Sequence, residues 1–351
     1  MPAPWAPVSL PSLVRMTRIL VVTPSWVGDC VMAQPLYRLL AIRYPDMELD
    51  VLAPAWTLPL HARMPEVAQA LDNPFAHGQL RLLDRFRLGQ QLQARQYDQA
   101  IVLPNSLKSA LVPWFARIPK RTGYLGEQRY GLLNDWRRLD EAAIPRMVDR
   151  FARLAAPENE SGSVVTPNPL LTADAQQVQA SMGDKHLTCH RPVVAFCPGA
   201  EYGPAKRWPV AHFADLGKLA VAAGAQVWIF GSSKELEIGE AIASGIGDHV
   251  FNLCGGTSLA QAIDLLSLSR AVVTNDSGLM HVAAALGRPV LAVYGSSSPI
   301  FTPPLSDSAQ TISLNVSCSP CFKRECPLGH MKCLNDLTAD YVWPQLFRYL
   351  S

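Results

Sequence analysis

The amino-acid sequence predicts an α/β protein built from two doubly wound, Rossmann-like domains that face each other across a cleft. Apolar segments rich in Val, Ile and Leu alternate with segments of helical spacing along most of the 351 residues. This alternation is typical of βαβ units around a parallel sheet. The chain is longer than one ordinary domain, and the same pattern starts again after a polar stretch near residue 160.

The first domain is expected to span residues 16–156. Its strand segments are short and rich in β-branched residues, whereas its helical segments show the longer apolar period. The expected strands are Arg18–Pro24, Glu48–Pro54, Glu66–Leu71, Asp98–Pro104 and Arg121–Tyr124, and the helices are Asp29–Tyr44, Leu80–Gln96, Ser106–Arg117 and Ala142–Ala156.

The second domain is expected to span residues 171–337, after a polar linker at residues 157–170 and before a C-terminal helix at residues 338–351. Clusters of polar residues and glycine between two periodic regions are typical of linkers. The expected strands are Pro192–Cys197, Ala225–Gly231, His249–Leu253, Arg270–Thr274 and Pro289–Gly295, and the helices are Pro209–Ala223, Lys234–Ser244, Ser258–Ser267, Gly278–Leu286 and Thr338–Leu350.

The composition excludes several classes of protein. A hydrophobic fraction of 49% with 17% charged residues is typical of a folded chain and excludes a disordered one. No apolar run approaches the roughly 20 residues that cross a bilayer. Residues 1–15 are proline-rich and lack the order of a secretory signal, so we expect a disordered extension and a cytoplasmic protein.

The charge is unevenly distributed between the two halves of the chain. Residues 1–155 carry 19 Lys and Arg against 13 Asp and Glu, whereas residues 156–351 carry 12 against 16. A basic first half indicates an acidic partner there, although ordinary scatter of surface charges gives the same count.

The most informative motif is the segment from Asn275 to Pro289. A buried strand runs into it and a helix of small residues leaves it, so Asp276, Ser277 and Gly278 lie where a helix begins. The unpaired N–H groups and the helix dipole make such a turn a binding site for phosphate or another anion.

The corresponding turn of the first domain contains Gly28 and Asp29. A Rossmann dinucleotide site would show G-x-G-x-x-G here, and its absence argues against a dehydrogenase. From local sequence alone Asp29 is more often an N-cap, and the functional alternative is a general base at the mouth of the cleft.

A third turn, from Cys197 to Pro209, joins a strand to a helix in the second domain. It brings Gly199, Lys206 and Arg207 to a second helix start, which suits a pyrophosphate group. Lys206 is the expected contact, and Arg207 is equally explained as a surface charge. Because no Asp-x-Asp pair is present, we expect cations and helix dipoles, and no catalytic metal, to stabilise a leaving diphosphate.

Four cysteines near the C-terminus have the spacing C-x2-C-x4-C-x6-C. They are Cys318, Cys321, Cys326 and Cys333. This spacing predicts either a structural zinc site or a loop with free thiols.

Taken together, these motifs resemble those of the ADP-heptose lipopolysaccharide heptosyltransferases, glycosyltransferase family 9. The resemblance covers about residues 16–305 and includes, besides the three turns, Ala53–Trp56, Leu103–Ser106, Arg129–Asp135 and Ser298–Pro304. It implies a GT-B fold and an inverting reaction without a required cofactor. It also implies ADP-L-glycero-β-D-manno-heptose as donor, bound by the second domain, and heptosyl-Kdo2-lipid A as acceptor, bound by the first.

The resemblance also implies roles for individual residues. Asp29 takes the position of the proposed base, which reverses the preference for a cap, and Lys206 takes that of a phosphate contact. Asp276 falls where the family holds heptose hydroxyls. The other expected substrate-binding residues are Ser25, Gly28, Gly199, Ser277, Gly278 and His281. Four cations of the first domain are candidates for binding an acidic acceptor, with solvated surface charge as the alternative: Lys108, Lys120, Arg121 and Arg129.

The expected partners are therefore a nucleotide sugar and a lipid acceptor, with no nucleic acid among them. We expect the protein to work at the inner face of the inner membrane, attached peripherally. The alternatives are a heptosyltransferase with a different core acceptor and a module that binds sugar nucleotides without catalysis.

Overall fold

The computed structural model describes residues 16–76, 78–157 and 165–351, and it contains two parallel six-stranded sheets. The strand order is β3-β2-β1-β4-β5-β6 in the first sheet and β12-β11-β10-β7-β8-β9 in the second. Both orders are doubly wound, since the chain reverses its direction of travel next to the first strand of each sheet. The fold class predicted from the sequence is confirmed.

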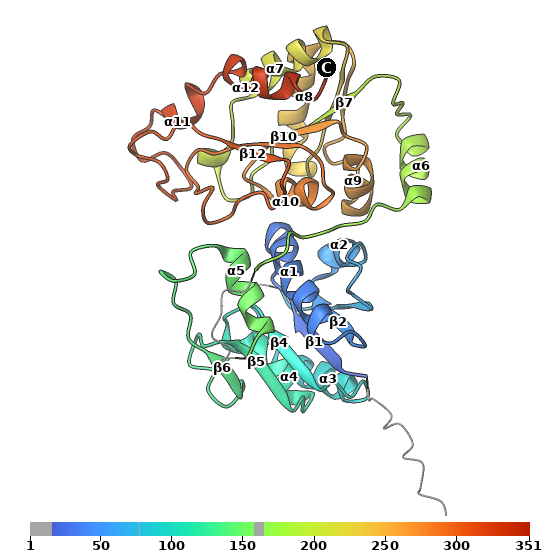
Figure 1. Cartoon of the computed structure of the whole chain (residues 1–351), viewed down its shortest axis with the longest axis vertical. Coiled ribbons are helices and arrows are strands. Elements are labelled where there is room, and N and C mark those ends of the chain that lie inside the picture. The colour runs from blue at the N-terminus through green and yellow to red at the C-terminus, as the bar shows by residue number, and fades with distance from the viewer. Residues whose placement is uncertain (1–15, 77, 158–164) are drawn as a thin grey trace, which may run out of the picture.

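In the first domain, helices cover both faces of the sheet (Figure 1). Helices α1, α2 and α5 lie on the face toward the second domain, and α3 and α4 lie on the opposite face. The strands are β1 Arg18–Val22, β2 Glu48–Ala53, β3 Gln69–Asp72, β4 Gln99–Val102, β5 Lys120–Tyr124 and β6 Asp135–Arg137. The helices are α1 Val27–Arg43, α2 Leu58–His61, α3 Leu82–Gln93, α4 Leu111–Phe115 and α5 Met147–Ala152, with 3-10 turns η1 Ala55–Thr57, η2 Leu107–Ala110 and η3 Arg153–Ala155.

The second domain repeats this architecture, and its last helix, α12, packs against α7 of the same domain. The strands are β7 Val193–Cys197, β8 Gln226–Ile229, β9 Val250–Asn252, β10 Ala271–Asn275, β11 Val290–Val293 and β12 Ala309–Ile312. The helices are α6 Ala175–Asp184, α7 Val210–Ala222, α8 Leu236–Ile246, α9 Leu259–Leu266, α10 Gly278–Ala285, α11 Lys332–Asn335 and α12 Ala339–Phe347, with 3-10 turns η4 Pro204–Lys206 and η5 Ser233–Glu235.

The predicted elements are observed with different ends, whereas the strands β6 and β12 and the helices α2, α6 and α11 were not predicted. The helix expected from Ala142 begins only at Met147, because the residue before Pro145 is biased away from helical geometry. The helix expected over Ser106–Arg117 is divided into η2 and α4. The expected disorder of residues 1–15 and most of the expected linker lie outside the described residues.

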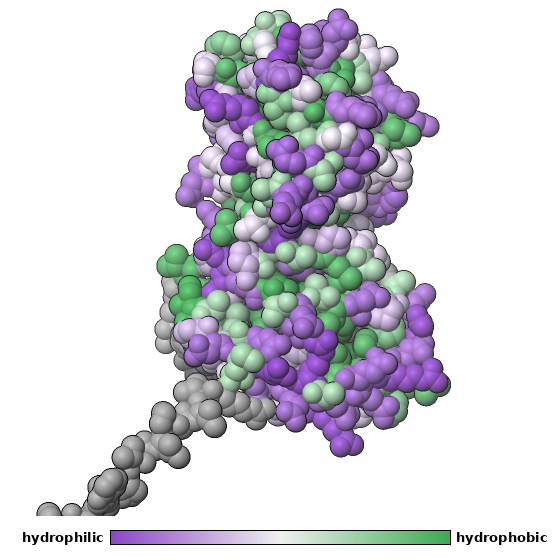
Figure 2. All heavy atoms as spheres, turned by 90° about the vertical axis from the view of Figure 1, so that its right-hand side faces the viewer, coloured by the Kyte–Doolittle hydropathy of each residue, from purple (hydrophilic) through white to green (hydrophobic). Residues whose placement is uncertain are grey.

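The two domains share one apolar core. Buried residues of α1, such as Val31 and Leu36, belong to the same cluster as Met280 and Val282 of α10. Figure 2 shows hydrophilic and hydrophobic residues mixed over both domains, and its outline narrows where they meet. Among the helices of the described residues, none has the length and apolar character that crossing a bilayer requires.

A buried ion pair reinforces this contact away from the cleft. Arg63, which follows α2, donates to Asp264 of α9 over 2.5 Å, and Asp264 is 1% exposed. The same carboxylate accepts the Asp174 backbone N–H at 3.0 Å. Burial raises the pKa of Asp264, while the Asp174 N–H and the charge of Arg63 act to lower it.

Replacing Arg63 by leucine should therefore leave the Asp264 carboxylate buried without a charged partner. We expect the free energy of unfolding to fall by about 3 kcal/mol, because removing one partner of a buried ion pair leaves the other charge buried without compensation. Urea unfolding followed by circular dichroism measures this change. The double variant Arg63→Leu/Asp264→Asn keeps an acceptor for the Asp174 N–H without the charge, and it should recover most of the loss. A wild-type midpoint for the single variant would contradict the role of the pair.

Candidate active site

The candidate site lies where the two domains meet, beside the carboxyl ends of the central strands of both sheets. The chain order reverses between β1 and β4 in the first sheet and between β7 and β10 in the second. Ligands of doubly wound sheets bind at such switch points. The first turn of α1, which follows β1, carries Asp29; η4, which follows β7, carries Lys206; and β10 leads directly into Asp276.

The starts of α1 and α10 approach each other closely because both contain glycine. A Cβ atom on Gly28 would lie 2.9 Å from Cδ2 of His281, and one on Gly278 would lie 3.0 Å from Cβ of Val27. Such distances exclude larger residues. Two helix N-termini from different domains are therefore brought together, and both present positive dipole ends and unpaired N–H groups to the same region.

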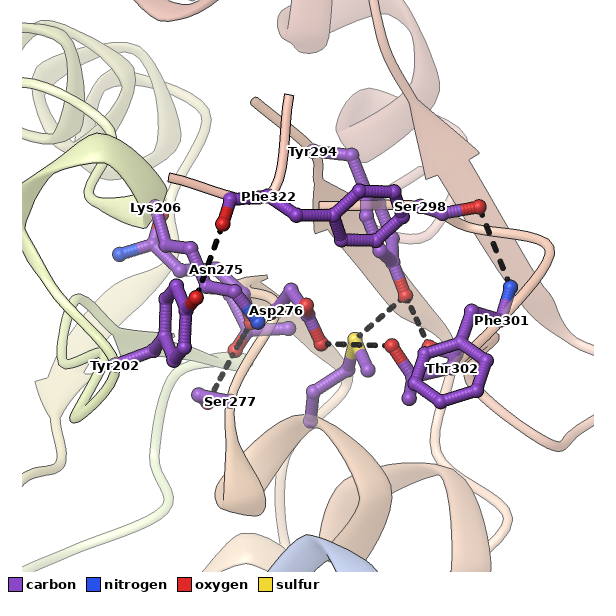
Figure 3. A network of polar contacts seen from close by, with 12 residues as sticks. Tyr202, Lys206, Asn275, Asp276, Ser277, Tyr294, Ser298, Phe301, Thr302 and Phe322 are labelled. Carbon is purple, nitrogen blue, oxygen red and sulfur yellow. Dashed lines mark hydrogen bonds and ion pairs between the residues drawn. The ribbon is translucent and has the colours of Figure 1, made fainter. Parts of the chain in front are cut away.

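Asp276 and Lys206 form an ion pair in the second domain, with Lys206 Nζ 2.6 Å from Asp276 Oδ2. The pair is largely buried, at 18% and 6% side-chain exposure. Lys206 also lies over the ring of Tyr202, 5.2 Å from its centroid, and Thr302 donates to the other oxygen of Asp276 at 3.5 Å (Figure 3). These contacts hold the lysine at the end of β10.

The neighbouring Asn275 locks the ends of β7 and β10 together. Its side chain is fully buried, donates to the carbonyl of Pro198 at 2.6 Å and accepts the backbone N–H of Trp208 at 3.0 Å. The loop that carries Lys206 is thus tied at both ends to the strand that carries Asp276.

Asp29 lies within electrostatic reach of this pair, although it belongs to the other domain. Burial raises the pKa of its carboxyl to about 6; the charge of Lys206 acts to lower it, and that of Asp276 to raise it further. Helix α1 begins at Val27, and Trp26 is its N-cap residue. The alternative that Asp29 caps the helix is therefore wrong, since Asp29 lies inside the first turn.

A cavity of about 700 Å³ opens next to these residues, a size that suits a nucleotide-sized ligand. Of the predicted substrate-binding residues, five line it: Ser25, Gly28, Gly199, Ser277 and Gly278. Asp29, Lys206 and Asp276 are not among its lining residues; Asp29 follows Gly28 and Asp276 precedes Ser277 in the chain, and Lys206 pairs with Asp276.

His281 lies beneath Gly28 and is 3% exposed. Burial lowers its pKa to about 4, so the ring is neutral at pH 7. Its Nδ1 has no hydrogen-bond partner among the described residues. The ring therefore supports the contact between the two helix starts, and substrate binding by His281 stays a prediction.

Trp56 and Glu235 also line the cavity, although neither is among the predicted substrate-binding residues. Trp56 is 57% exposed and donates from Nε1 to the carbonyl of Ser25 at 3.0 Å. Glu235 accepts from the backbone N–H and hydroxyl of Ser232 and completes a capping box after β8. The sequence contains a signal for both, since Glu235 belongs to a polar turn after a strand and Trp56 to one of the segments that resemble the family.

The four cations proposed for acceptor binding differ in their surroundings. Arg129 is fully buried and donates to the carbonyls of Tyr124 and Pro104, so it organises these loops and is not available to a surface ligand. Arg121 is likewise used by loop carbonyls. Lys120 pairs with Asp135 at 3.4 Å, and Lys108 is half-buried beside α3.

The four cysteines predicted as a zinc site are free thiols in the structure and line a second, smaller cavity. Among the described residues, no three His, Cys, Asp or Glu side chains are gathered into a set of metal ligands. A formed zinc site is therefore not observed.

Comparison with known proteins identifies the family. The model described as glycosyltransferase family 9 (heptosyltransferase) matches residues 85–332. Lipopolysaccharide heptosyltransferase 2 of Salmonella typhimurium is 49% identical over 346 residues, which cover 95% of this chain and 99% of the relative. The chain belongs to glycosyltransferase family 9.

A solved structure shows the same arrangement. The ADP-heptose lipopolysaccharide heptosyltransferase II of Escherichia coli superimposes with a TM-score of 0.86 at 45% identity, and the match covers 95% of this chain and 98% of that one. The family and the GT-B architecture implied by the sequence motifs are thereby confirmed. The chain is an enzyme of the glycosyltransferase class.

In this family 9 enzyme, the charge of Lys206 should control the protonation of Asp29 across the domain interface. Replacing Lys206 by methionine removes the charge that lowers the pKa of Asp29, so that pKa should rise above about 6. A ¹³C NMR titration of the aspartate carboxyls measures the shift. Lys206→Arg keeps the charge and should leave the midpoint near the wild-type value. A midpoint at or below that of the wild type in Lys206→Met would contradict the coupling.

Proposed function

We propose that this enzyme is a heptosyltransferase II. It would transfer L-glycero-D-manno-heptose from ADP-L-glycero-β-D-manno-heptose to the inner-core heptose of heptosyl-Kdo2-lipid A, with inversion and without a catalytic metal. The observation that carries the proposal is the meeting of Asp29, Lys206 and Asp276 from two domains beside a nucleotide-sized cavity. Relatives called heptosyltransferase 2 that match nearly the whole chain support the choice of substrates.

The proposed base is Asp29. A carboxylate whose pKa lies near 6 is ionised at pH 7 and is more basic than an ordinary aspartate. It would accept the proton of an acceptor heptose hydroxyl while that oxygen forms a bond to the anomeric carbon of the donor. The bond from this carbon to the diphosphate breaks on the opposite face, and its electron pair leaves with ADP.

The leaving diphosphate gains negative charge as this bond breaks. Lys206 and the start of α10 at Ser277 and Gly278 would stabilise that charge, because a lysine and unpaired N–H groups interact more strongly with the developing anion than with the bound donor. Asp276 lies 2.6 Å from the same lysine, where it orients the amine. Its other oxygen would accept from heptose hydroxyls.

An assay with two purified acceptors tests this function. We expect ADP release from ADP-heptose with heptosyl-Kdo2-lipid A, and little with Kdo2-lipid A. Asp29→Asn should lower kcat by about 10²–10⁴-fold, since the general base is lost, while ADP still binds in calorimetry.

Other results in the same assay would assign other functions. Preference for Kdo2-lipid A would indicate a heptosyltransferase I, and donor binding without transfer to either acceptor would indicate a non-catalytic module. A kcat for Asp29→Asn within tenfold of the wild type would remove Asp29 from the mechanism.

We also propose that the enzyme works at the inner face of the inner membrane, through a surface on α3, η2 and α4. This surface, the α3–α4 patch, consists of Leu82, Leu83, Phe86, Leu107 and Trp114, each at least 38% exposed. Phe86 and Trp114 both contact the ring of Phe115, with centroids 5.3 and 4.9 Å away, so the patch is continuous between α3 and α4.

Charge complementarity favours an anionic bilayer as the partner of the α3–α4 patch. Cationic residues lie near its apolar members in the chain, namely Arg81, Arg87, Lys108 and Arg117, and the first two share one acidic partner, Asp84. Apolar side chains with neighbouring cations bind peripherally to membranes that carry anionic lipids. A lipid acceptor would place the enzyme at such a surface.

Replacing Leu83 by glutamate should weaken binding to vesicles that contain phosphatidylglycerol. Leu83 is 71% exposed, so the change adds charge repulsion without disturbing the core, and we expect about a tenfold loss in cosedimentation. Ile42→Glu is the matched control, because Ile42 is 74% exposed on α1 outside the patch. Equal losses for both variants, or none for Leu83→Glu, would contradict the assignment.

A further inference from the structure

The loop that follows β12 is built against the segment that carries Lys206. The backbone N–H of Ala205 donates to the carbonyl of Arg324 at 3.0 Å, and the hydroxyl of Tyr202 donates to the carbonyl of Phe322 at 3.0 Å (Figure 3). The guanidinium of Arg324 lies over the ring of Tyr202, and the amine of Lys206 lies over the same ring. The position of this loop therefore influences the position of the lysine.

Apolar packing holds this loop mainly at its two ends. Residues 313–331 contain neither helix nor strand. Loops of this length without secondary structure are uncommon in compact domains, and they are usually functional. Leu314 and Met331 pack against the core of the second domain, whereas Phe322 and Leu328 between them are 51% and 61% exposed. The middle of the loop is held by hydrogen bonds, such as that from the backbone N–H of Phe322 to the carbonyl of Ser296 at 2.7 Å.

Four cysteines line one small cavity inside the loop. Cys318, Cys321, Cys326 and Cys333 surround a space of about 50 Å³, which accommodates an ion but not a nucleotide. All four are free thiols of intermediate exposure. Four such groups at one cavity repel one another as thiolates unless a cation neutralises them.

The chain turns tightly after Cys326, where the backbone N–H of Gly329 donates to the carbonyl of Cys326 at 3.1 Å. Gly329 permits this turn because its φ is +69°. The turn keeps Cys326 at the cavity that the other three cysteines also line. Nothing in the proposed transfer reaction requires such an arrangement at Cys326.

We propose that Cys318, Cys321, Cys326 and Cys333 bind one thiolate-preferring metal ion, Zn²⁺ in the first instance, and that this ion holds the loop against the segment of Lys206. Each thiol would release its proton to solvent on binding. The ion is structural, because four cysteines leave it no open coordination position.

Binding requires the thiols to move inward from the positions observed. Among the described residues they do not yet form a set of metal ligands, and a tetrahedral site needs Zn–S distances of about 2.3 Å. Three of the four lie on the irregular loop, and only Cys333 lies on a helix, α11. Closure around an ion therefore moves a segment that no helix or strand constrains.

Elemental analysis of the full-length protein, purified without chelator, tests the proposal. We expect about one zinc or iron ion per chain in the wild type. The variants Cys326→Ser and Cys333→Ser should each lose this ion. Cys189→Ser is the matched control, because Cys189 is an exposed free cysteine outside the loop, and it should retain the metal. Titration of the metal-free wild type with Co²⁺ gives a second readout that needs no variant, since thiolate coordination produces a charge-transfer absorption band.

Three results would overturn the proposal. They are a purified protein without metal that shows no cobalt–thiolate band, a Cys326→Ser variant that keeps one metal ion per chain, and a disulfide between two of the four cysteines, detected by mass spectrometry.

Removal of the ion should also raise KM for ADP-heptose by about tenfold, because Lys206 loses its support. Only this kinetic readout rests on the proposed function. Metal binding without a change in KM would overturn the support of Lys206 and leave the transferase activity untouched.

Discussion

The close approach of α1 and α10 is the constraint on which the rest of the active site depends. Two glycines make it possible, since a Cβ atom on Gly28 or on Gly278 would press against the other domain within about 3 Å. The contact brings one helix start from each domain to the same place. It also brings Asp29 within electrostatic reach of Lys206 and Asp276 of the other domain.

The electrostatics of the site follow from this contact. Two carboxylates and one lysine share a region from which water is largely excluded, and Lys206 pairs directly with Asp276. Asp29 is left without that direct partner, and burial dominates its pKa. The environments therefore differ enough for two aspartates of similar intrinsic acidity to take different roles, one as a base and one as an orienting group.

The sequence predicted the parts of the site that local patterns encode. A buried strand that runs into Asn275, Asp276 and a small-residue helix can be recognised without knowing what lies opposite, and the same holds for the turn that leads to Lys206. Contacts between segments far apart in the chain could not be predicted. Arg129 looked like any basic surface residue, yet it is buried and donates to the carbonyls of Pro104, Ser106 and Tyr124.

The sequence also predicted the ends of helices less accurately than their positions, for a physical reason. Helix α1 begins two residues before Asp29, because the chain enters it through Trp26 without a side-chain cap. A capping residue is the main local signal for a helix start, so its absence moved the expected start to the first acidic side chain. The general-base assignment came from the family resemblance, and the observed helix start removes the capping role that competed with it.

The interface between the domains therefore has a chemical as well as a structural role. Were the domains to separate, Asp29 would be hydrated and its pKa would move back toward the ordinary value of 3.8. The pKa of Asp29 thus depends on whatever keeps α1 against α10, including the shared apolar core and the distant pair of Arg63 and Asp264. Under the proposed mechanism, catalysis would then depend on domain closure, because burial raises the pKa of the Asp29 carboxyl.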